Sequence, residues 1–299
     1  MDLTVLAIFA RVAELESFTR AAEQLGLPKA RVSTAVQQLE AQLGTQLLHR
    51  TTRRVRLTPD GELFLFRCTQ LLAEADELAS LFRQSGAALR GRLRLDMPTG
   101  LARRVVIPQL PAFLAAHPQL TVDISSTDRR VDLVHEGFDC VVRVGRLHDS
   151  GLVARTLGHY RMVNCASPAY LAEHGTPRTL ADLDRHRLIH YAPTLGGQTS
   201  GFDHVERGQE RCRPMAGSVT VANADAYEAA CLAGLGIIQV PAAGVQALLR
   251  DGRLVQLLPR HVPAPMPVSL LYAHRRHQPA RLQALIAWLA ALITPYLEA

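Results

Sequence analysis

The first sixty residues carry apolar side chains at helical spacing. The apolar positions of a first expected helix lie one, three or four residues apart, at Leu3, Leu6, Phe9, Ala10 and Ala13. Ser17 is suited to cap a short second helix, and Gly26 is suited to end it. Pro28 can open a third helix, because the first turn of a helix needs no backbone N–H at that position. The pattern therefore predicts three short helices in succession.

The third expected helix has one apolar stripe and one polar face. The stripe consists of Val32, Val36, Leu39 and Leu43. The polar face and the N-terminal end carry Lys29, Ala30, Arg31, Ser33, Thr34 and Gln37. Two helices joined by a glycine-containing turn predict a helix-turn-helix over about residues 19–38, whose second helix presents such side chains to base edges. Taken alone, the same face is more often a solvated surface, and the segment that follows favours the DNA-binding interpretation.

A basic β-hairpin is predicted directly after these helices. Val55 and Leu57 alternate with arginines, which is the period of a half-buried strand. The polar residues of the strand and turn that we expect to contact DNA are Arg50, Thr52, Arg53 and Arg54. Such a hairpin, over about residues 46–58, is a wing whose arginines can contact phosphates. Pro59 then ends the strand and is suited to the first position of a helix.

Residues 59–88 are predicted to form a long helix with a seam for a second copy of the chain. Apolar positions recur at an average step of about 3.5 residues, at Phe64, Cys68, Leu71, Ala75, Leu78 and Phe82. This period is typical of a coiled coil. Packing of the seam onto its own chain is the alternative, because only two to three heptads are present.

From residue 91 onward, predicted strands and helices alternate. The strands of a first series cover 91–97, 120–125 and 138–145, with helices over 101–117 and 131–137. The strands of a second series cover 161–167, 187–192, 217–223 and 235–241, with helices over 168–175, 224–234 and 242–250. The chain returns through a strand over 268–274 and a helix over 280–297. This rhythm predicts two α/β lobes with open parallel sheets and a ligand cleft at the C-terminal ends of the strands.

Polar and small residues follow several of these strands. The segment Ser125 to Asp128, for example, follows the second strand. The candidate effector-binding residues at such strand ends are Thr99, Gly100, Ser126, Thr127, Gly145, Arg146, Asn223 and Ala224. Helix N-termini with hydroxyls and free amides bind anions, so we expect a small polar or anionic ligand. Thr99 and Asn223 are equally suited to be simple helix caps.

Composition and charge narrow the class of protein. The chain has 299 residues, a formal net charge of +6 and a pI of about 9.4, which permits a polyanionic partner. Its five cysteines are scattered without zinc spacing, which is typical of a reducing cytosol. Neither a signal peptide nor a membrane span is indicated, so we expect a cytoplasmic protein without membrane contact. His274 and His277 lie among arginines and indicate surface rather than a metal site, and no cofactor is expected.

The chain as a whole resembles the LysR-type transcriptional regulators. The segments that carry the resemblance are FTRAAEQLGLPKARVSTAVQQLEAQLGTQLLHRTTRRVRLTPDGE, VDLVHEGFDCVVRVGRLHDSGLVARTLG, ASPAYLAEHG and LAGLGIIQVP. The resemblance implies an N-terminal winged helix-turn-helix, a dimerising linker helix and an effector domain shaped like a periplasmic binding protein. It also implies dimers or tetramers on double-stranded promoter DNA with an interrupted palindrome, a small-molecule effector, and RNA polymerase as a further candidate partner.

The resemblance also sets the expected boundaries. They are 1–58 for the DNA-binding domain, 59–88 for the linker helix, and 91–299 for the effector domain, with lobe I over 91–161 and 266–299 and lobe II over 162–265. Pro28-Lys29-Ala30 stands where many members have Ser-Gln-Pro, and Thr34 stands where many have arginine. Thr34 cannot form the bidentate contact of arginine to guanine, so we expect a different base preference, with Lys29 and Arg31 compensating.

Two other functions stay open at this point. An enzyme could use the two-lobed domain, since α/β folds host many chemistries. The sequence lacks GxSxG, HExxH and P-loop motifs, so no catalytic residue is assigned. A DNA-binding protein without a ligand would leave the two-lobed domain unexplained.

Overall fold

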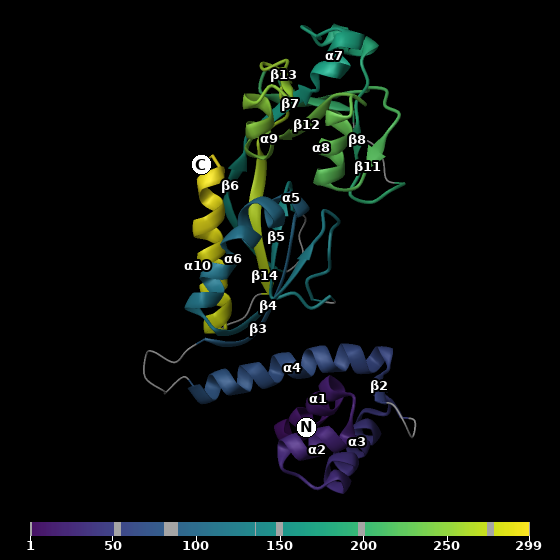
Figure 1. The fold of residues 1–299 in the computed structure, drawn as a ribbon, viewed down its shortest axis with the longest axis vertical. Coiled ribbons are helices and arrows are strands. Elements are labelled where there is room, and N and C mark those ends of the chain that lie inside the picture. The colour runs from purple at the N-terminus through teal and green to yellow at the C-terminus, as the bar shows by residue number, and fades with distance from the viewer. Residues whose placement is uncertain are drawn as a thin grey trace. The chain divides into compact units, whose positions relative to one another are not determined.

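The chain forms two compact units, Met1–Ala88 and Leu89–Ala299 (Figure 1). The computed structural model describes residues 2–50, 55–80, 89–134, 136–147, 152–196, 201–273 and 278–298. An N-terminal winged helix-turn-helix and a two-lobed α/β domain, the fold class expected from the sequence, are confirmed. In these ranges no helix is both long and apolar enough to cross a membrane.

Three short helices and a β-hairpin open the N-terminal unit. These elements are α1 (Leu3–Leu15), α2 (Phe18–Leu25), α3 (Lys29–Leu43), β1 (Leu48–Arg50) and β2 (Val55–Leu57). The Oγ of Ser17 accepts the backbone N–H of Arg20 at 3.3 Å and so caps α2. Gly26 ends α2 with a left-handed φ of 64°, which glycine adopts without a Cβ clash. Both local signals therefore act as expected.

Helix α4 (Pro59–Ser80) completes the hydrophobic core of this unit. The ring of Phe64 lies edge-on against that of Phe9 in α1, with centroids 5.4 Å apart. Cys68 is buried, its Sγ donates to the carbonyl of Leu6 at 3.3 Å, and burial raises the pKa of its thiol to about 11. The expectation that Phe64 and Cys68 face a second copy of the chain is therefore wrong. Helix α1 offers them an apolar surface within their own unit.

Thr58 and Gly61 hold the junction between β2 and α4. Thr58 is buried, and its Oγ1 donates to the carbonyl of Gln46 at 2.7 Å and accepts the N–H of Gly61 at 2.9 Å. A Cβ at position 61 would lie 1.9 Å from the carbonyl oxygen of Leu47. The strand ends before Pro59 and the helix begins there, as the sequence predicts. Glycine is required at 61 because another segment of backbone passes beside it.

Lobe I of the C-terminal unit is built on a five-stranded mixed sheet. In spatial order its strands are β4 (Gln119–Ser126), β3 (Arg90–Met97), β5 (Cys140–Val144), β14 (Met266–Ala273) and β6 (Leu152–Tyr160). Strand β3 runs parallel to β4 and β5, whereas β14 runs antiparallel to β5 and β6. The late strand β14 therefore lies inside the sheet, between two strands from the first half of the unit (Figure 1).

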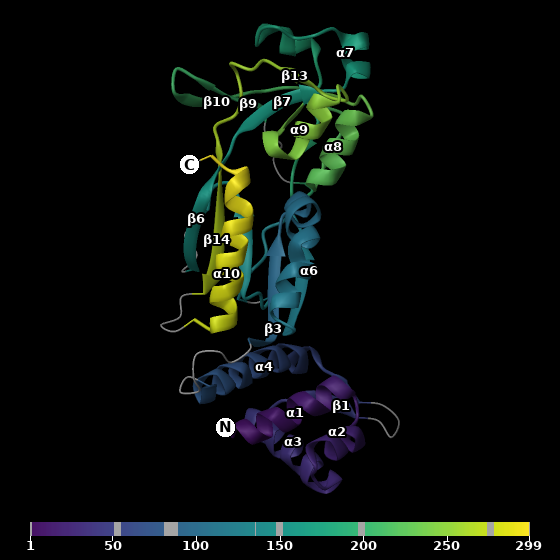
Figure 2. The ribbon, with the colours of Figure 1, turned by 60° about the vertical axis from the view of Figure 1, so that its left-hand side comes forward.

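Helices from both ends of the unit pack together on the lobe I sheet (Figure 2). They are α5 (Thr99–Leu101), a π-helical turn (Ala102–Val106), α6 (Ile107–Ala116), α10 (Ala280–Ile293) and a 3-10 turn (Thr294–Tyr296). Phe113 of α6 stacks on Trp288 of α10 with ring centroids 4.6 Å apart. Pro108 and Pro111 have no N–H to donate within this helix, which favours the widened turn before them.

Lobe II is smaller and more irregular. Its main sheet consists of β12 (Ile238–Pro241), β7 (Met162–Ala166) and β13 (Val255–Leu257), in that order. Two short pairs accompany it: β8 (His190–Tyr191) with β11 (Thr220–Val221), and β9 (Phe202–Glu206) with β10 (Gln209–Arg213). Its helices are α7 (Pro168–His174), α8 (Ala224–Leu232) and α9 (Ala242–Arg250), with a 3-10 turn at Ala181–Arg185.

Three features of the C-terminal unit correct the sequence-based prediction. The main sheet of lobe II is antiparallel rather than parallel, because β7 lies between β12 and β13, the two strands that α9 connects. The described part of 131–137 forms turns rather than a helix, and its Leu133 packs against Phe138 and Val141. Strand β6 and the β9–β10 hairpin were not predicted, because β6 is an edge strand and the residues of β10 are mostly exposed. Their apolar residues therefore show little alternation.

Candidate nucleic-acid interface and ligand cleft

One face of α3 is buried and the other is exposed and polar. The buried positions are Val32, Ala35, Val36 and Leu39. The exposed positions include five of the six predicted base-reading residues, namely Lys29, Ala30, Arg31, Thr34 and Gln37. Ser33, the sixth, is half-buried. The exposed N-terminal half of α3 therefore offers cationic, hydroxyl and amide donors, which suit the acceptors in the major groove of DNA.

Glu40 connects α3 to the hairpin. Its carboxylate accepts the backbone N–H of Leu47 at 2.9 Å and that of Leu48 at 3.0 Å. One side chain of α3 thus orients the first strand of the wing. Because both amides point at a single carboxylate, this connection constrains the direction in which β1 leaves the helix.

The wing is a short antiparallel hairpin with basic residues on its strands. His49 lies opposite Arg56, and Arg50 lies opposite Val55. The side chains of His49 and Arg56 are exposed, and of Arg50 the backbone is described. The predicted phosphate-contacting residues Thr52, Arg53 and Arg54 lie outside the described residues. The sequence places them in the connection between β1 and β2.

Beyond Cys68, helix α4 exposes apolar side chains to solvent. Leu71 is 46% exposed, and Ala75 is half-buried. Before Cys68, Leu63, which lies outside the predicted seam, is also exposed, at 52%. Leu78 belongs to the helix but its side chain is not described, and Phe82 lies outside the described residues. The part of the predicted seam that can face a partner therefore begins at Leu71.

A cavity of about 520 Å³ opens between the two lobes. Its lining residues are Thr99, Ser126, Thr127, Asp128, Arg129, Pro193, Ala222, Asn223 and Asp225. Four of them, Thr99, Ser126, Thr127 and Asn223, were predicted from their positions at strand ends. Cavities of this size suit small metabolites, and the lining is polar enough to orient one.

Two other predicted residues lie beside the cavity and two lie apart from it. Gly100 and Ala224 lie where the lobes approach, since a Cβ at Gly100 would be 3.9 Å from the Cβ of Ala224. Arg146 is 77% exposed and pairs with Glu210 of β10. Gly145, with a φ of 99°, precedes it and does not line the cavity. The end of β5 therefore turns toward the β9–β10 hairpin rather than into the cleft.

Asn223 has both of the roles that the sequence allowed. Its side-chain oxygen accepts the N–H of Ala226 at 2.8 Å, so it caps α8. It also lines the cavity. Thr99, by contrast, follows the N-cap Pro98 and does not cap its helix with its side chain.

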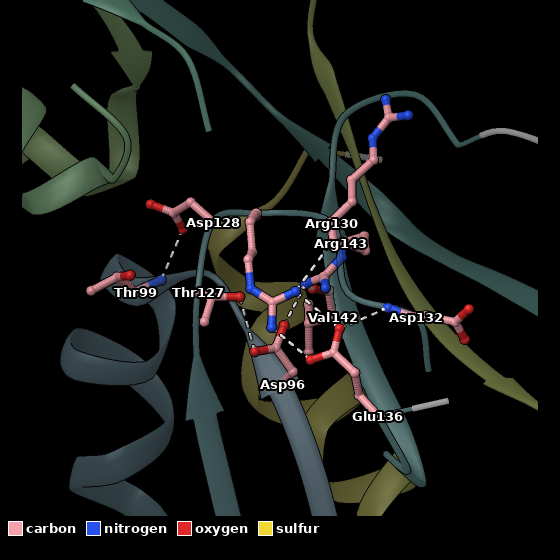
Figure 3. Close-up of polar contacts among 10 residues, drawn as sticks. Asp96, Thr99, Thr127, Asp128, Arg130, Asp132, Glu136, Val142 and Arg143 are labelled. Atoms are coloured by element: carbon pink, nitrogen blue, oxygen red, sulfur yellow. Dashed lines mark hydrogen bonds and ion pairs between the residues drawn. The ribbon is translucent and has the colours of Figure 1, made fainter. Parts of the chain in front are cut away.

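Asp128 joins the two sides of the cleft. Its Oδ1 accepts the backbone N–H of Thr99 at 3.0 Å, and its Oδ2 accepts that of Ala224 at 2.6 Å. Burial, and then the negative charge of Asp128, raise the pKa of Tyr191 of lobe II. Figure 3 shows Asp128 beside Thr99, at the first turn of α5.

Two arginines of lobe I near the cleft, Arg129 and Arg143, are bound to carboxylates. Arg143 donates to Asp96 at 2.8 Å, and Thr127 donates to the other oxygen of Asp96 at 3.2 Å (Figure 3). Arg129 binds Glu136 through both of its terminal nitrogens, at 2.9 and 2.6 Å. The hydrogen bond from Arg129 lowers the pKa of Glu136. In the part of the chain that the structure describes, these two guanidinium groups are therefore engaged by carboxylates of lobe I.

Two further arginines bridge the lobes at the start of α8. Arg103 donates to Asp225 at 3.0 Å, and Arg104 donates to Glu228 at 2.5 Å. Arg104 also donates to the carbonyl of Gly244 in α9 at 2.7 Å. The π-helical turn of lobe I therefore contacts both helices of lobe II that face it. Among the residues described, no group of three His, Cys, Asp or Glu side chains could hold a metal ion.

Family models match nearly the whole chain. The model described as "Bacterial regulatory helix-turn-helix protein, lysR family" matches residues 3–62. The model described as "LysR substrate binding domain" matches residues 86–293. The first match lies within the N-terminal unit, and the second begins close to the division between the two compact units.

Similar proteins and solved structures cover both units. The chain is 44% identical to the HTH-type transcriptional regulator YhjC of Escherichia coli, over 98% of each chain. It is 38% identical to an HTH-type transcriptional repressor of Pseudomonas aeruginosa, over 97% of this chain and 92% of that one. The full-length Vibrio cholerae virulence activator AphB matches with a TM-score of 0.58 and 29% identity, over 97% of this chain and 99% of that one. CrgA of Neisseria meningitidis, a LysR-type transcriptional regulator, matches with a TM-score of 0.61 and 28% identity, over 99% of each chain.

Proposed function

The chain belongs to the LysR family of transcriptional regulators, and on that premise we propose that it reads a promoter through α3 and the wing while a small ligand in the inter-lobe cleft adjusts that binding. The single observation that supports the ligand role is the polar cavity between the lobes, lined by residues from both. A mobility-shift assay on the chain's own upstream DNA, with and without candidate metabolites, tests the proposal. DNA binding that no ligand changes would favour a ligand-independent regulator.

Base reading is assigned to the exposed end of α3. Lys29 and Arg31 can donate to the acceptors of guanine, and Gln37 can pair with adenine through its amide. Thr34 offers a hydroxyl and a methyl group, which suit a smaller contact than arginine makes. The order of these groups along one helix face supports a short recognition sequence on each half-site.

Phosphate contact is assigned to the wing. The residues proposed for it are Arg50, Thr52, Arg53 and Arg54. Guanidinium groups bind phosphate oxygens in bidentate fashion, and such contacts position a protein without selecting a sequence. The link from Glu40 to β1 supports a fixed direction for the hairpin relative to α3.

Assembly is assigned to the outer part of α4. Leu71 and Ala75, with Leu78 and Phe82 further along the sequence, would form the contact with a second copy. A two-fold dimer matches an interrupted palindrome, and pairs of dimers would give a tetramer. RNA polymerase is a further partner that a regulator bound near a promoter can reach.

The ligand is assigned to Thr99, Ser126, Thr127 and Asn223. Their hydroxyl and amide groups come from both lobes, so a ligand bound to them would change the free energy difference between lobe arrangements. We propose a polar ligand with an anionic group, since the N-terminus of α8 faces the cavity. The alternative is a neutral polar metabolite. The same mobility-shift assay distinguishes the two, because it compares charged and neutral candidates.

A further inference from the structure

We propose that Asp128 is an internal latch, whose carboxylate holds the two lobes together in the ligand-free protein and which an anionic ligand releases by taking its place. The proposal rests on the proposed function of the cleft. It concerns a residue that lies at the end of β4 and binds the first residues of helices in different lobes.

The geometry of the carboxylate connects the lobes directly. One oxygen accepts the N–H of Thr99 in lobe I, and the other accepts the N–H of Ala224 in lobe II, at 3.0 and 2.6 Å. Both donors are first residues of helical segments, and at Ala224, which begins the nine-residue α8, the helix dipole also favours negative charge. Opening the lobes would therefore separate the carboxylate from at least one of its donors.

The contacts of Asp128 are of a kind that a ligand can replace. Within the described ranges, no Lys, Arg or His forms an ion pair with Asp128, so the backbone amides of Thr99 and Ala224 meet its charge. Its side chain lines the cavity and is half-buried. By comparison, Asp96 is 0% exposed and bound to Arg143, which is 13% exposed. A ligand carboxylate offers the same two acceptors, so it can exchange for Asp128 without leaving a buried charge unpaired.

The neighbouring arginines explain why the exchange would occur at these amides. Arg129 is bound to Glu136, and Arg143 is bound to Asp96. An anion that enters the cleft therefore finds its donors at the two backbone amides that Asp128 occupies. Because the ligand must compete with an internal group, its apparent affinity is lower than its intrinsic affinity. Ligand binding and lobe release are thereby coupled.

Two arginine bridges across the cleft are the alternative explanation for its closure. Arg103 and Asp225 are 57% and 34% exposed, and exposed pairs of this kind contribute little to stability. Arg104 is less exposed, at 32%, and contacts both Glu228 and Gly244. An experiment on the latch must therefore separate the effect of Asp128 from that of Arg104.

The test measures the distance between the lobes in the full-length protein by pulsed electron resonance. One spin label is attached to Cys212 of lobe II, which is exposed while the other four cysteines are buried. The second is attached to a new cysteine, Gln109→Cys, on the exposed surface of α6. Labelled protein is diluted with unlabelled protein so that distances within one chain dominate. The variants are Asp128→Ala, Arg104→Gln and, as a matched control on the preceding strand β4, Asp123→Ala, which removes the partner of Arg92 and Arg94 outside the cleft.

We expect Asp128→Ala to lengthen and broaden the inter-lobe distance distribution, and Asp123→Ala to leave it unchanged. Sodium acetate should restore the original distribution in Asp128→Ala, because it supplies the missing carboxylate, whereas acetamide of the same size should not. Hydrogen exchange at the amide of Ala224 should rise at least about tenfold in the variant and fall again with acetate, since a bond to a charged acceptor is lost and regained.

A distance distribution in Asp128→Ala that matches the parent protein would overturn the latch, and a change confined to Arg104→Gln would assign closure to the arginine bridge. Equal effects of acetate and acetamide would also overturn it. If Asp128→Ala fails to fold, Asp128→Asn decides, because it keeps the side chain's size and removes its charge; an unchanged distance there contradicts the latch. DNA binding by the parent protein and its response to metabolites are measured separately, so failure of the latch leaves the proposed function standing.

Discussion

Gly61 lies so close to the carbonyl oxygen of Leu47 that a Cβ at position 61 would be 1.9 Å from it. We expect Gly61→Ala to reduce the free energy of unfolding of the N-terminal unit by about 3 kcal/mol, because backbone rather than a flexible side chain must move. Gly44→Ala is the matched control, since nothing lies within 4 Å of a Cβ there and only its left-handed φ of 69° is strained. That change should cost about 1 kcal/mol. Urea unfolding measures both, and equal losses would show that the contact at 61 relaxes easily.

Substitutions at Leu71 and at Phe64 should distinguish the role of α4 in assembly from its role in folding. Leu71→Glu places a charge on the exposed part of α4, so we expect a smaller species by light scattering with little change in the unfolding midpoint. Phe64→Ala removes a ring packed on Phe9, so we expect a loss of about 3 kcal/mol in stability. If Leu71→Glu has the same molecular mass as the parent protein, the dimer contact lies outside this part of α4.

The wing arginines should contribute affinity without sequence preference. We expect Arg53→Ala to weaken binding to every DNA sequence alike and to flatten the dependence of log K on log salt by about one unit. Arg92→Ala, an exposed arginine of the C-terminal unit, is the control and should leave the slope unchanged. Titrations at several salt concentrations provide the measurement. A loss restricted to the specific site, with the slope intact, would assign Arg53 to base reading.

Gln37 should contribute sequence preference. Gln37→Ala removes an exposed amide from the N-terminal half of α3, so we expect one position of the site to lose about 1–3 kcal/mol of discrimination. Gln42→Ala, on the C-terminal half of the same helix, is the control. Selection from random DNA measures both preferences. If the Gln37 variant selects the same site at full affinity, Gln37 is a solvated residue that does not contact bases.

Thr99 should affect the ligand response and not DNA binding. Thr99→Val keeps the size of the side chain and removes a hydroxyl from the cavity lining, while the backbone N–H that donates to Asp128 is retained. We expect the DNA-bound fraction without ligand to match that of the parent protein, and the shift caused by an active metabolite to be lost. Thr121→Val, exposed on β4, is the control. A normal response from Thr99→Val would place the ligand on other residues of the cleft.

Much of the N-terminal unit could be predicted from sequence because its elements are specified locally. The apolar stripe of α3, the cap at Ser17 and the glycine at 26 each act within one or two turns. The start of α4 at Pro59 is equally local. The same periodicity could not show what the seam of α4 faces. A stripe at Phe64 and Cys68 is equally apolar whether α1 or a second chain covers it, and tertiary packing decided for α1.

In the C-terminal unit, the local pattern located the strand ends that carry Thr99, Ser126, Thr127 and Asn223, so four residues of the cavity could be predicted without the structure. It also determined that the segment Ser125 to Asp128 lies at a strand end. Three features depend on contacts between distant segments: Asp128 binds Ala224, Arg146 pairs with Glu210 instead of entering the cleft, and the main sheet of lobe II is antiparallel. These contacts join residues that are far apart in the sequence, so no local pattern could predict them. Helix periodicity and capping act between residues a few positions apart, whereas Asp128 and Ala224 are 96 positions apart and meet because two separately built lobes are brought together.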